Sequence, residues 1–165
     1  MTRRRILLSD ATILRAIRLR ALESDPLAFG STLAREISRE TSDWEAWART
    51  HASGPDKATF LELDGERALG IAAGMRDADD ATRFGLFSMW VAPEARRRGV
   101  GRALVEDVIT WAAAQGGRSI RLFVTQPGAI AFYQTCGFVD DGRREPLVHT
   151  PAVIEIGMTR PLQRV

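Results

Sequence analysis

The sequence predicts a mixed α/β fold built on one sheet, and three observations lead to it. Apolar residues recur at helical spacing over residues 10–24 and again over 102–115. Residues 58–91 instead read as successive strands, and Asp64-Gly65 is typical of a tight hairpin turn. A strand, a helix and another strand then follow over residues 83–125, which predicts a parallel, right-handed crossover.

The N-terminal segment is expected to form a short strand and a helix. The strand runs from about Arg4 to Leu8, and either Ser9 or Asp10 can cap the helix that follows. The helix should end at Asp25-Pro26, because the residue before a proline avoids the helical region. Its apolar face consists of Ile13, Leu14, Ile17 and Ala21.

A loop from Asp25 to Thr32 leads into further helix. Ser42 to Glu45 has the spacing of a capping box, and Trp44, Trp47 and Ala48 lie on the face behind it. The expected strands after this helix are Ala58–Leu63, Ala68–Met75, Arg83–Val91, Ser119–Thr125, one near Phe138 and Val153–Arg160. The expected helices among them are Arg102–Gln115, stopped by Gly116-Gly117, and Gly128–Thr135.

Composition limits the classes of protein to which this chain can belong. Its 165 residues suit one domain, expected over residues 1–165, and 45% apolar with 27% charged residues argue against disorder. Its apolar runs are far shorter than the roughly 20 residues that span a bilayer. Ile6–Leu8 is also shorter than the about 7–15 apolar residues of a signal peptide. With a single cysteine, Cys136, these features predict a cytoplasmic protein that binds no membrane.

A glycine-rich turn joins the expected strand 83–91 to the helix 102–115. Its sequence is Arg96-Arg-Arg-Gly-Val-Gly-Arg-Ala103, in which glycines allow close backbone approach and the helix N-terminus presents free N–H groups. The arginines ahead of the turn suit a ligand with several phosphates. A P-loop is excluded because the only lysine is Lys57, and a Rossmann fingerprint is disfavoured because Leu104 replaces its third glycine.

Two motifs in residues 83–138 resemble those of the GNAT superfamily of N-acetyltransferases. The pattern Gln/Arg-x-x-Gly-x-Gly/Ala, after a strand ending in Val-x-Pro, is matched by Val91, Pro93, Arg96, Gly99 and Gly101. The pattern Asn-x-x-Ala-x-x-x-Tyr-x-x-x-Gly-Phe is matched by Ala129, Tyr133, Gly137 and Phe138, with Gln126 in place of the asparagine. The two motifs have the family's spacing and order, and together they cover about a third of the chain.

This resemblance implies a fold and a cosubstrate. The fold would be a mixed, mostly antiparallel sheet with helices on both faces and one parallel strand pair that splays apart. The pantetheine arm of acetyl-CoA would lie in that gap like an additional strand, and backbone N–H groups of Arg97 to Ala103 would cradle the pyrophosphate. The residues implied in acetyl-CoA binding are Met89, Trp90, Val91, Arg96, Arg97, Arg98, Gly99, Val100, Gly101, Arg102, Ala103, Gln126, Ala129, Phe132 and Tyr133.

The resemblance also implies two catalytic groups. The N–H of Met89 would stabilise the negative charge that develops on the thioester oxygen. The phenol of Tyr133, whose ordinary pKa is about 10, would protonate the departing thiolate. The acetyl group would then pass directly to an amine of a small molecule or a protein, without a covalent enzyme intermediate. Cys136 is therefore expected to be a buried packing residue and not a nucleophile.

The proton acceptor for the amine stays open. Histone-type members carry a glutamate on the motif strand, and counting back from Gly99 places it at Gly85, where no acid stands. Water, His149 or Glu36 could take the proton instead. His51 and His149 have no metal-ligand spacing, so no metal is expected.

Two other functions stay as alternatives to an acetyltransferase. A non-catalytic module of the same fold could bind acyl-CoA as a sensor or regulator, and it would release no thiol from acetyl-CoA. An arginine-rich nucleic-acid binder would show steeply salt-dependent binding and no affinity for CoA. The net charge of only +2 leads us to expect no nucleic-acid partner. A monomer and a homodimer are both compatible with the sequence.

Overall fold

A computed structural model describes residues 1–163, so the last two residues of the expected domain, 164–165, lie outside the described residues. The strands are β1 (Thr2–Arg5), β2 (Lys57–Asp64), β3 (Arg67–Arg76), β4 (Arg83–Val91), β5 (Ser119–Val124), β6 (Val139–Leu147) and β7 (Thr150–Pro161). The α-helices are α1 (Ala11–Ser24), α2 (Leu33–Ile37), α3 (Thr41–Ala52), α4 (Val100–Ala114) and α5 (Pro127–Thr135). Three short 3-10 turns also occur, η1 (Leu8–Asp10), η2 (Pro26–Ala28) and η3 (Pro93–Ala95).

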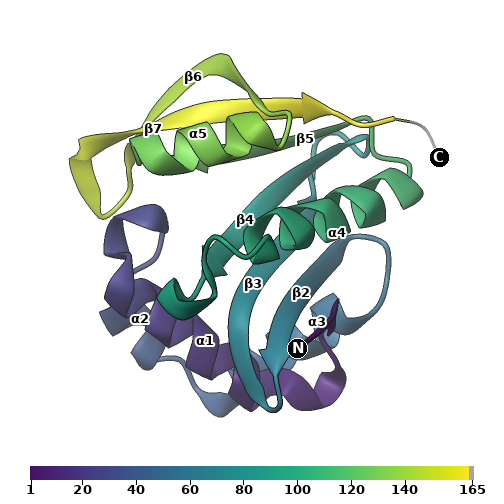
Figure 1. Cartoon of the computed structure of the whole chain (residues 1–165), viewed down its shortest axis with the longest axis vertical. Helices are drawn as coiled ribbons and strands as arrows, with labels where there is room; N and C mark the ends of the chain where they lie inside the picture. The colour runs from purple at the N-terminus through teal and green to yellow at the C-terminus, as the bar shows by residue number, and fades with distance from the viewer. Residues whose placement is uncertain (164–165) are drawn as a thin grey trace.

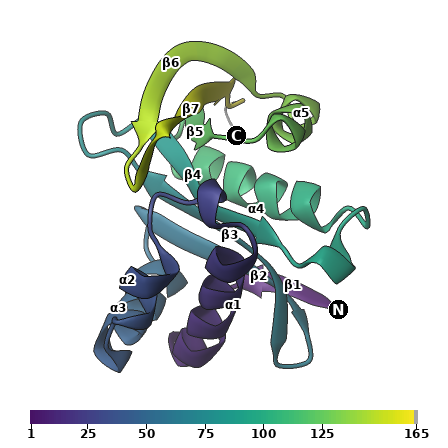
Figure 2. The same cartoon turned by 90° about the vertical axis from the view of Figure 1, so that its left-hand side faces the viewer.

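The described strands form one seven-stranded sheet in the order β1-β2-β3-β4-β5-β7-β6. Each neighbouring pair is antiparallel except β4 and β5, which run parallel and are joined through α4. The helices cover both faces: α4 and α5 lie on one side of the sheet, and α1, α2 and α3 lie on the other (Figures 1 and 2). The predicted mixed fold and the predicted parallel crossover are therefore confirmed.

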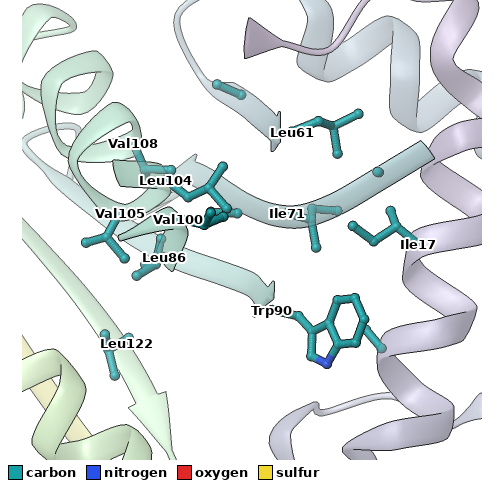
Figure 3. Packing of buried hydrophobic residues seen from close by; sticks show 14 of the residues in the cluster. Ile17, Leu61, Ile71, Leu86, Trp90, Val100, Leu104, Val105, Val108 and Leu122 are labelled. Carbon is teal, nitrogen blue, oxygen red and sulfur yellow. The ribbon is translucent and has the colours of Figure 1, made fainter. Parts of the chain in front are cut away.

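Apolar side chains from α4 and α1 meet the sheet from its two sides. Val100, Leu104, Val105 and Val108 project from α4 toward β3 and β4, while Ile17 of α1 lies beside Ile71 and Trp90 (Figure 3). A close approach of α4 requires a glycine on β3. A Cβ atom at Gly70 would stand 2.7 Å from Cδ1 of Leu104, so a larger residue there would push the helix away.

The first strand ends three residues earlier than predicted, at Arg5 instead of Leu8. The cause is Asp10, whose carboxylate accepts hydrogen bonds from the Leu7 amide at 2.7 Å and from the Arg4 guanidinium at 2.5 Å. These contacts turn the chain into η1 before α1 begins at Ala11. Asp10 occupies the N-cap position of α1, but its side chain binds the preceding residues Arg4 and Leu7 and makes no capping hydrogen bond to the helix.

The predicted capping box at Ser42 to Glu45 is wrong. Helix α3 begins at Thr41, and the amide of Glu40 donates to the carboxylate of Asp43 at 3.0 Å. Several acids and hydroxyls follow one another here, and the chain uses the pair that lies slightly earlier in the sequence. None of the helices within residues 1–163 is both long enough and apolar enough to cross a bilayer.

Candidate active site

The parallel pair β4–β5 is joined over only part of its length. Register pairs link Arg83 with Ser119, Phe84 with Ile120 and Gly85 with Arg121, and the ladder stops there. Beyond that point the two strands diverge, as their directions in Figure 1 show. The splayed strand pair that the sequence resemblance implied is thus present.

A β-bulge lies on β4 where the strands have separated. The β3 pairing shifts between Ile71 and Ala73, so two β4 residues, Ser88 and Met89, face the single residue Ala72. Ser88 has φ of 54°, a conformation that few residues other than glycine adopt. A bulge of this kind leaves one backbone group of its strand outside the ladder, which allows that group to face a ligand.

A cleft of about 620 Å3 opens between the diverging strands and the N-terminal helices. Its walls include residues of α1, α2, β4, β5, α5 and β7. Met89 and Tyr133, the two residues expected to act in catalysis, both line this cleft. The structure therefore brings them to one cavity from β4 and α5, although 44 positions separate them in the sequence.

The glycine-rich turn leads directly into α4, as expected. Arg97 and Gly99 adopt positive φ values of 59° and 80°, and Gly99 is the N-cap of the helix. The amides of Val100, Gly101 and Arg102 lie in the first turn, where a helix has no internal partner for them. The amide of Ala103 instead donates to the Gly99 carbonyl at 3.0 Å, so it is not free for a phosphate.

Three expected cosubstrate residues meet at Gly101. A Cβ atom built there would lie 3.3 Å from Cε of Met89 and 3.3 Å from Cζ of Phe132. The ring of Phe132 in turn packs 5.1 Å from the ring of Tyr133. The start of α4, the bulge of β4 and α5 therefore converge, and glycine leaves room for the ends of the Met89 and Phe132 side chains.

Arg96 and Trp90 direct their side chains away from the turn. The Arg96 guanidinium donates to the Val91 carbonyl at 2.9 Å and to the Asp25 carboxylate at 3.0 Å. The Trp90 indole also donates to Asp25, at 2.7 Å. Asp25 is the C-cap of α1, so these contacts fasten the end of β4 to the end of α1. The pKa of Asp25 is lowered because these hydrogen bonds and the Arg96 charge outweigh its partial burial.

The remaining expected residues lie around the start of α4 and α5. Arg97 and Arg98 are exposed and have no ion-pair partner among residues 1–163, so their charges are available to an anion. Arg102 donates to the Thr135 carbonyl at 3.0 Å and links α4 to α5. Gln126 is the exposed N-cap of α5, and Ala129 lies half-buried one turn later.

Tyr133 is buried, with 8% of its surface exposed, yet it lines the cleft. Its hydroxyl forms no hydrogen bond with any described residue. Burial raises the pKa of the phenol well above its usual 10, so it stays protonated across the physiological range. Burial likewise raises the pKa of the Cys136 thiol, which disfavours the thiolate that a nucleophile would need.

Phe87 occupies the space above Gly85. A Cβ atom at Gly85 would stand 2.4 Å from Cε2 of Phe87, because residues two apart on a strand share one face. A side chain at this position would therefore require the half-exposed Phe87 ring to move.

The two expected candidates for the proton acceptor are both committed to other contacts. His149 lies in the β6–β7 turn, where Nε2 is 2.7 Å from the Phe29 carbonyl and Nδ1 is 3.0 Å from the Thr150 hydroxyl. Because a carbonyl only accepts, Nε2 carries the proton and Nδ1 accepts from Thr150. Glu36 is 1% exposed and forms ion pairs with Arg18 and Arg39.

The sequence analysis did not identify Glu155, an acidic residue that lines the cleft from β7. Burial and the charge of Glu145, its register partner on β6, raise the pKa of the Glu155 carboxyl, while His149 opposes them. A raised pKa brings a carboxylate closer to the range in which a general base works. Glu155 stands in the expected strand Val153–Arg160, and nothing in the sequence of that strand singles out position 155.

Across residues 1–163, no three His, Cys, Asp or Glu side chains gather in a group that could hold a metal ion. The site is instead formed by backbone N–H groups, arginines, one buried phenol and apolar side chains. Such a combination suits an extended ligand with a phosphorylated end.

Comparison with known proteins agrees with this geometry. Residues 18–138 match the family model described as acetyltransferase (GNAT) family. A ribosomal protein bS18-alanine N-acetyltransferase from Salmonella typhimurium is 32% identical over 108 residues, which are 58% of this chain and 71% of that protein.

Solved structures show the same fold. An acetyltransferase of the GNAT family from Streptococcus pneumoniae superposes with a TM-score of 0.83 at 24% identity, covering 98% of this chain and 99% of that one. A GNAT phosphinothricin acetyltransferase from Sinorhizobium meliloti, solved with acetyl-CoA, gives 0.79 at 21% identity, covering 98% and 88% of the two chains. The family match over residues 18–138, with a splayed sheet and a glycine turn at the start of α4, shows that this chain belongs to the GNAT acetyltransferase family.

Proposed function

We propose that residues 1–165 form one catalytic domain that transfers the acetyl group of acetyl-CoA directly to an amine. The observation that carries this proposal is the position of Met89, which lines the cleft together with Tyr133 and also lies against Gly101 of the glycine-rich turn. A phosphate bound by the turn and a thioester in the cleft would therefore be close enough to belong to one ligand. A module that only sensed acyl-CoA would need the turn but not the phenol in the cleft.

Acetyl-CoA would be bound mainly by backbone. The free amides of Val100, Gly101 and Arg102 support a pyrophosphate site at the N-terminus of α4, with Arg97 and Arg98 adding charge. The side chain of Arg96 would hold the strand end and not a phosphate, because it already binds Asp25. The pantetheine arm would run along β4 where β5 has diverged, pairing with backbone that the sheet leaves open.

When bound, acetyl-CoA supplies an activated acetyl group as a thioester. The N–H of Met89, next to the bulge, would face the thioester oxygen and stabilise the negative charge that develops there. The Tyr133 phenol is protonated and has no protein partner, so its proton is available to the departing sulfur. Its raised pKa disfavours a lasting tyrosinate, so the phenol would have to regain a proton as the sulfur leaves. The attacking nitrogen carries one proton more than the amide keeps, and this proton would replace the one that Tyr133 gives to the sulfur.

We assign the removal of the amine proton to Glu155, acting directly or through a water in the cleft. An ammonium cannot attack a thioester, so one proton must leave before the C–N bond forms. Glu155 is the carboxylate of the cleft that has no ion-pair partner within residues 1–163, whereas Glu36 and Asp77 each bind two arginines. His149 keeps both nitrogens engaged, and its side chain fastens the β6–β7 turn to Phe29.

Release of free CoA thiol from acetyl-CoA tests the proposal. The purified chain should release thiol at a rate that depends on an added amine and rises with its concentration. An acyl-CoA sensor would bind CoA, visible as a higher melting temperature, yet would release no thiol with any amine. A nucleic-acid binder would show neither effect.

A further inference from the structure

The cleft beside the reaction centre is rich in arginine. Six arginines and three carboxylates line it, so its lining is positively charged. Three of these arginines pair with aspartates within 3.2 Å: Arg76 with Asp56, Arg121 with Asp77 and Arg143 with Asp141. The other three, Arg18, Arg35 and Arg39, come from α1 and the α2 region on one side of the cleft.

Arg18 is the most deeply buried member of this group. Only 7% of its surface is exposed, and its Nε atom is buried without any hydrogen-bond partner. Its Nη2 atom lies 3.8 Å from Oε1 of Glu36, which is too long for a hydrogen bond. Burial lowers the pKa of this arginine, although an arginine stays charged in practice. A buried cation with an unused N–H is costly, unless a ligand completes its coordination.

Glu36 does not neutralise its neighbours. Its Oε2 atom lies 2.8 Å from Nε of Arg39, so the carboxylate is closer to Arg39 than to Arg18. Arg35 also lines the cleft, and no carboxylate of the described residues lies within ion-pair distance of it. Three guanidinium groups thus share one carboxylate, and the subsite has a positive charge left over.

This subsite adjoins the reaction centre. The Nη1 atom of Arg18 lies 3.4 Å from the hydroxyl of Ser88, the residue that precedes Met89 in the bulge. The guanidinium is stacked over Phe29 at 4.7 Å from the ring centroid, and Trp47 lies 5.9 Å away. Two aromatic rings therefore fix Arg18 in place, so its unused N–H is already oriented before a ligand arrives.

We propose that the amine acceptor carries a carboxylate or a similar oxyanion close to its nitrogen, as an amino acid does, and that Arg18 binds this anion. The short distance between Arg18 and the bulge sets the separation of anion and amine. The positive charge of the subsite would repel a polyamine. This inference rests on the proposed function, because it names the acceptor class of the same site.

The test compares acceptors with and without the anion, and rates are expressed per concentration of unprotonated amine because the amine of a carboxamide has a lower pKa than that of the amino acid. Thiol release is measured with the common α-amino acids, with the carboxamide of each, and with spermidine. For the best amino acid, kcat/KM should exceed that of its carboxamide by about 10²-fold, since a charge-assisted bidentate contact is lost in the amide. Spermidine should be the poorest acceptor. Melting temperature with each compound gives a second readout that needs no turnover.

Variants of two arginines locate the effect. The ratio of kcat/KM for the amino acid to kcat/KM for its carboxamide should fall to about unity in Arg18→Gln. Arg18→Lys keeps the charge and should therefore retain part of the preference for the acid. Arg143→Gln is the matched control: it removes an arginine of the same cleft whose charge is balanced by Asp141, so the ratio should not change. The CoA-induced rise in melting temperature shows that each variant is folded and binds the cosubstrate.

Every outcome bears on the subsite. Equal turnover of acids and amides, or a preference for spermidine, would overturn it while leaving the acetyltransferase function intact. Amino acids that raise the melting temperature of the wild type and not of Arg18→Gln, without thiol release, would support the subsite and contradict the proposed catalysis. If no amino acid is acetylated and none raises the melting temperature, the proposed subsite is overturned.

Discussion

The two sides of the splayed strands are assembled from different parts of the chain. The proposed acetyl-CoA side comes from residues 83–138, a continuous stretch in which strand, turn, helix and strand follow one another. The proposed acceptor side combines α1, α2 and β7, so that Arg18 and Glu155 line one cleft although 137 positions separate them. One side is formed by local backbone geometry, and the other by long-range packing.

This difference determines which chemistry each side can hold. Backbone amides at a helix start bind phosphate whatever the side chains are, so the acetyl-CoA side needs little more than Gly99 and Gly101. The acceptor side depends on guanidinium and carboxylate groups whose positions are set by α1, α2 and β7. Substitutions on the two sides should therefore have separable effects, one on CoA binding and the other on turnover and acceptor choice.

The largest expected effect is on the acetyl-CoA side, in Gly101→Glu. The new carboxylate would stand at the pyrophosphate site and press on Met89 and Phe132, which lie 3.3 Å from the Cβ position. CoA binding should weaken by about 10³-fold, because like charges in contact cost several kcal/mol. The rise in melting temperature on adding CoA should disappear.

Ala114→Glu is the matched control for that change. It places the same carboxylate on the exposed far end of α4, so the CoA-induced shift should persist. An undiminished shift in Gly101→Glu would mean that the phosphates bind elsewhere. The assignment of residues 83–138 to acetyl-CoA binding would then be wrong.

Tyr133→Phe tests the point where the two sides meet. Because the hydroxyl has no protein partner and the ring packs on Phe132 and Phe138, removing the oxygen should leave stability and CoA binding unchanged. Thiol release should show kcat lower by about 10²-fold or more, with little change in KM. Wild-type turnover in this variant would mean that Tyr133 does not protonate the departing thiolate and only packs against its neighbours.

Glu155→Gln tests the acceptor side alone. Thiol release at neutral pH should fall by about 10²-fold, and the difference should shrink at high pH, where free amine forms without a base. In the wild type the rate should rise with pH as Glu155 ionises, at a higher pH than for an ordinary glutamate because burial and Glu145 raise its pKa.

Glu145→Gln sharpens this test. It removes one of the charges that raise the pKa of Glu155, so the rise in rate should move to lower pH. If Glu155→Gln keeps the wild-type rate and pH profile, another group or bulk water takes the proton.

The smallest expected effect concerns stability on the acceptor side. The Trp47 indole donates to the Thr59 hydroxyl, which contacts Nδ1 of His51 at 2.8 Å. Neutral His51 therefore helps to position Trp47, which lines the cleft. Burial lowers the pKa of His51 to about 4. Below pH 6.5 the unfolded chain gains a proton that the folded chain does not, so stability is lost as the pH falls toward 4.

Urea unfolding at pH 7 and pH 5 measures this loss. We expect the free energy of unfolding to fall by about 1–2 kcal/mol between them through His51, since one pKa unit corresponds to about 1.4 kcal/mol. His51→Gln should reduce this acid sensitivity. Equal sensitivity in wild type and His51→Gln would exclude His51 as the cause.

The sequence predicted the acetyl-CoA side more fully than the acceptor side. Glycine residues at Gly99 and Gly101, followed by a helical apolar stripe, indicate local backbone geometry and need no knowledge of the rest of the fold. Arg18, by contrast, is one of several arginines on α1, and nothing local distinguishes it from the exposed Arg15 or the half-buried Arg20. Only packing against Phe29 and Glu36 buries it.

Two residues close to the site show that the sequence did not reveal which side chains contact one another. Arg96 belongs to the family motif, but its side chain binds Asp25, 71 positions away, so the motif does not reveal what the side chain contacts. His149 was correctly placed between the last two strands, yet its hydrogen bond to Phe29 could not be read from its neighbours in the sequence. Both contacts depend on where η2 lies relative to the sheet.

The short β4–β5 ladder also bears on how the molecule opens. Among the described strands, hydrogen bonding between the block β1–β4 and the block β5–β7–β6 is limited to three register pairs at one end. The sheet therefore has a seam across its middle, where local separation breaks few backbone hydrogen bonds. A ligand that pairs along β4 in the open part of this seam would act as a removable cross-link between the two blocks. Amide hydrogen exchange along β4 and β5 would then slow when the site is filled, and the cosubstrate would become part of the cooperative unit that it helps to hold together.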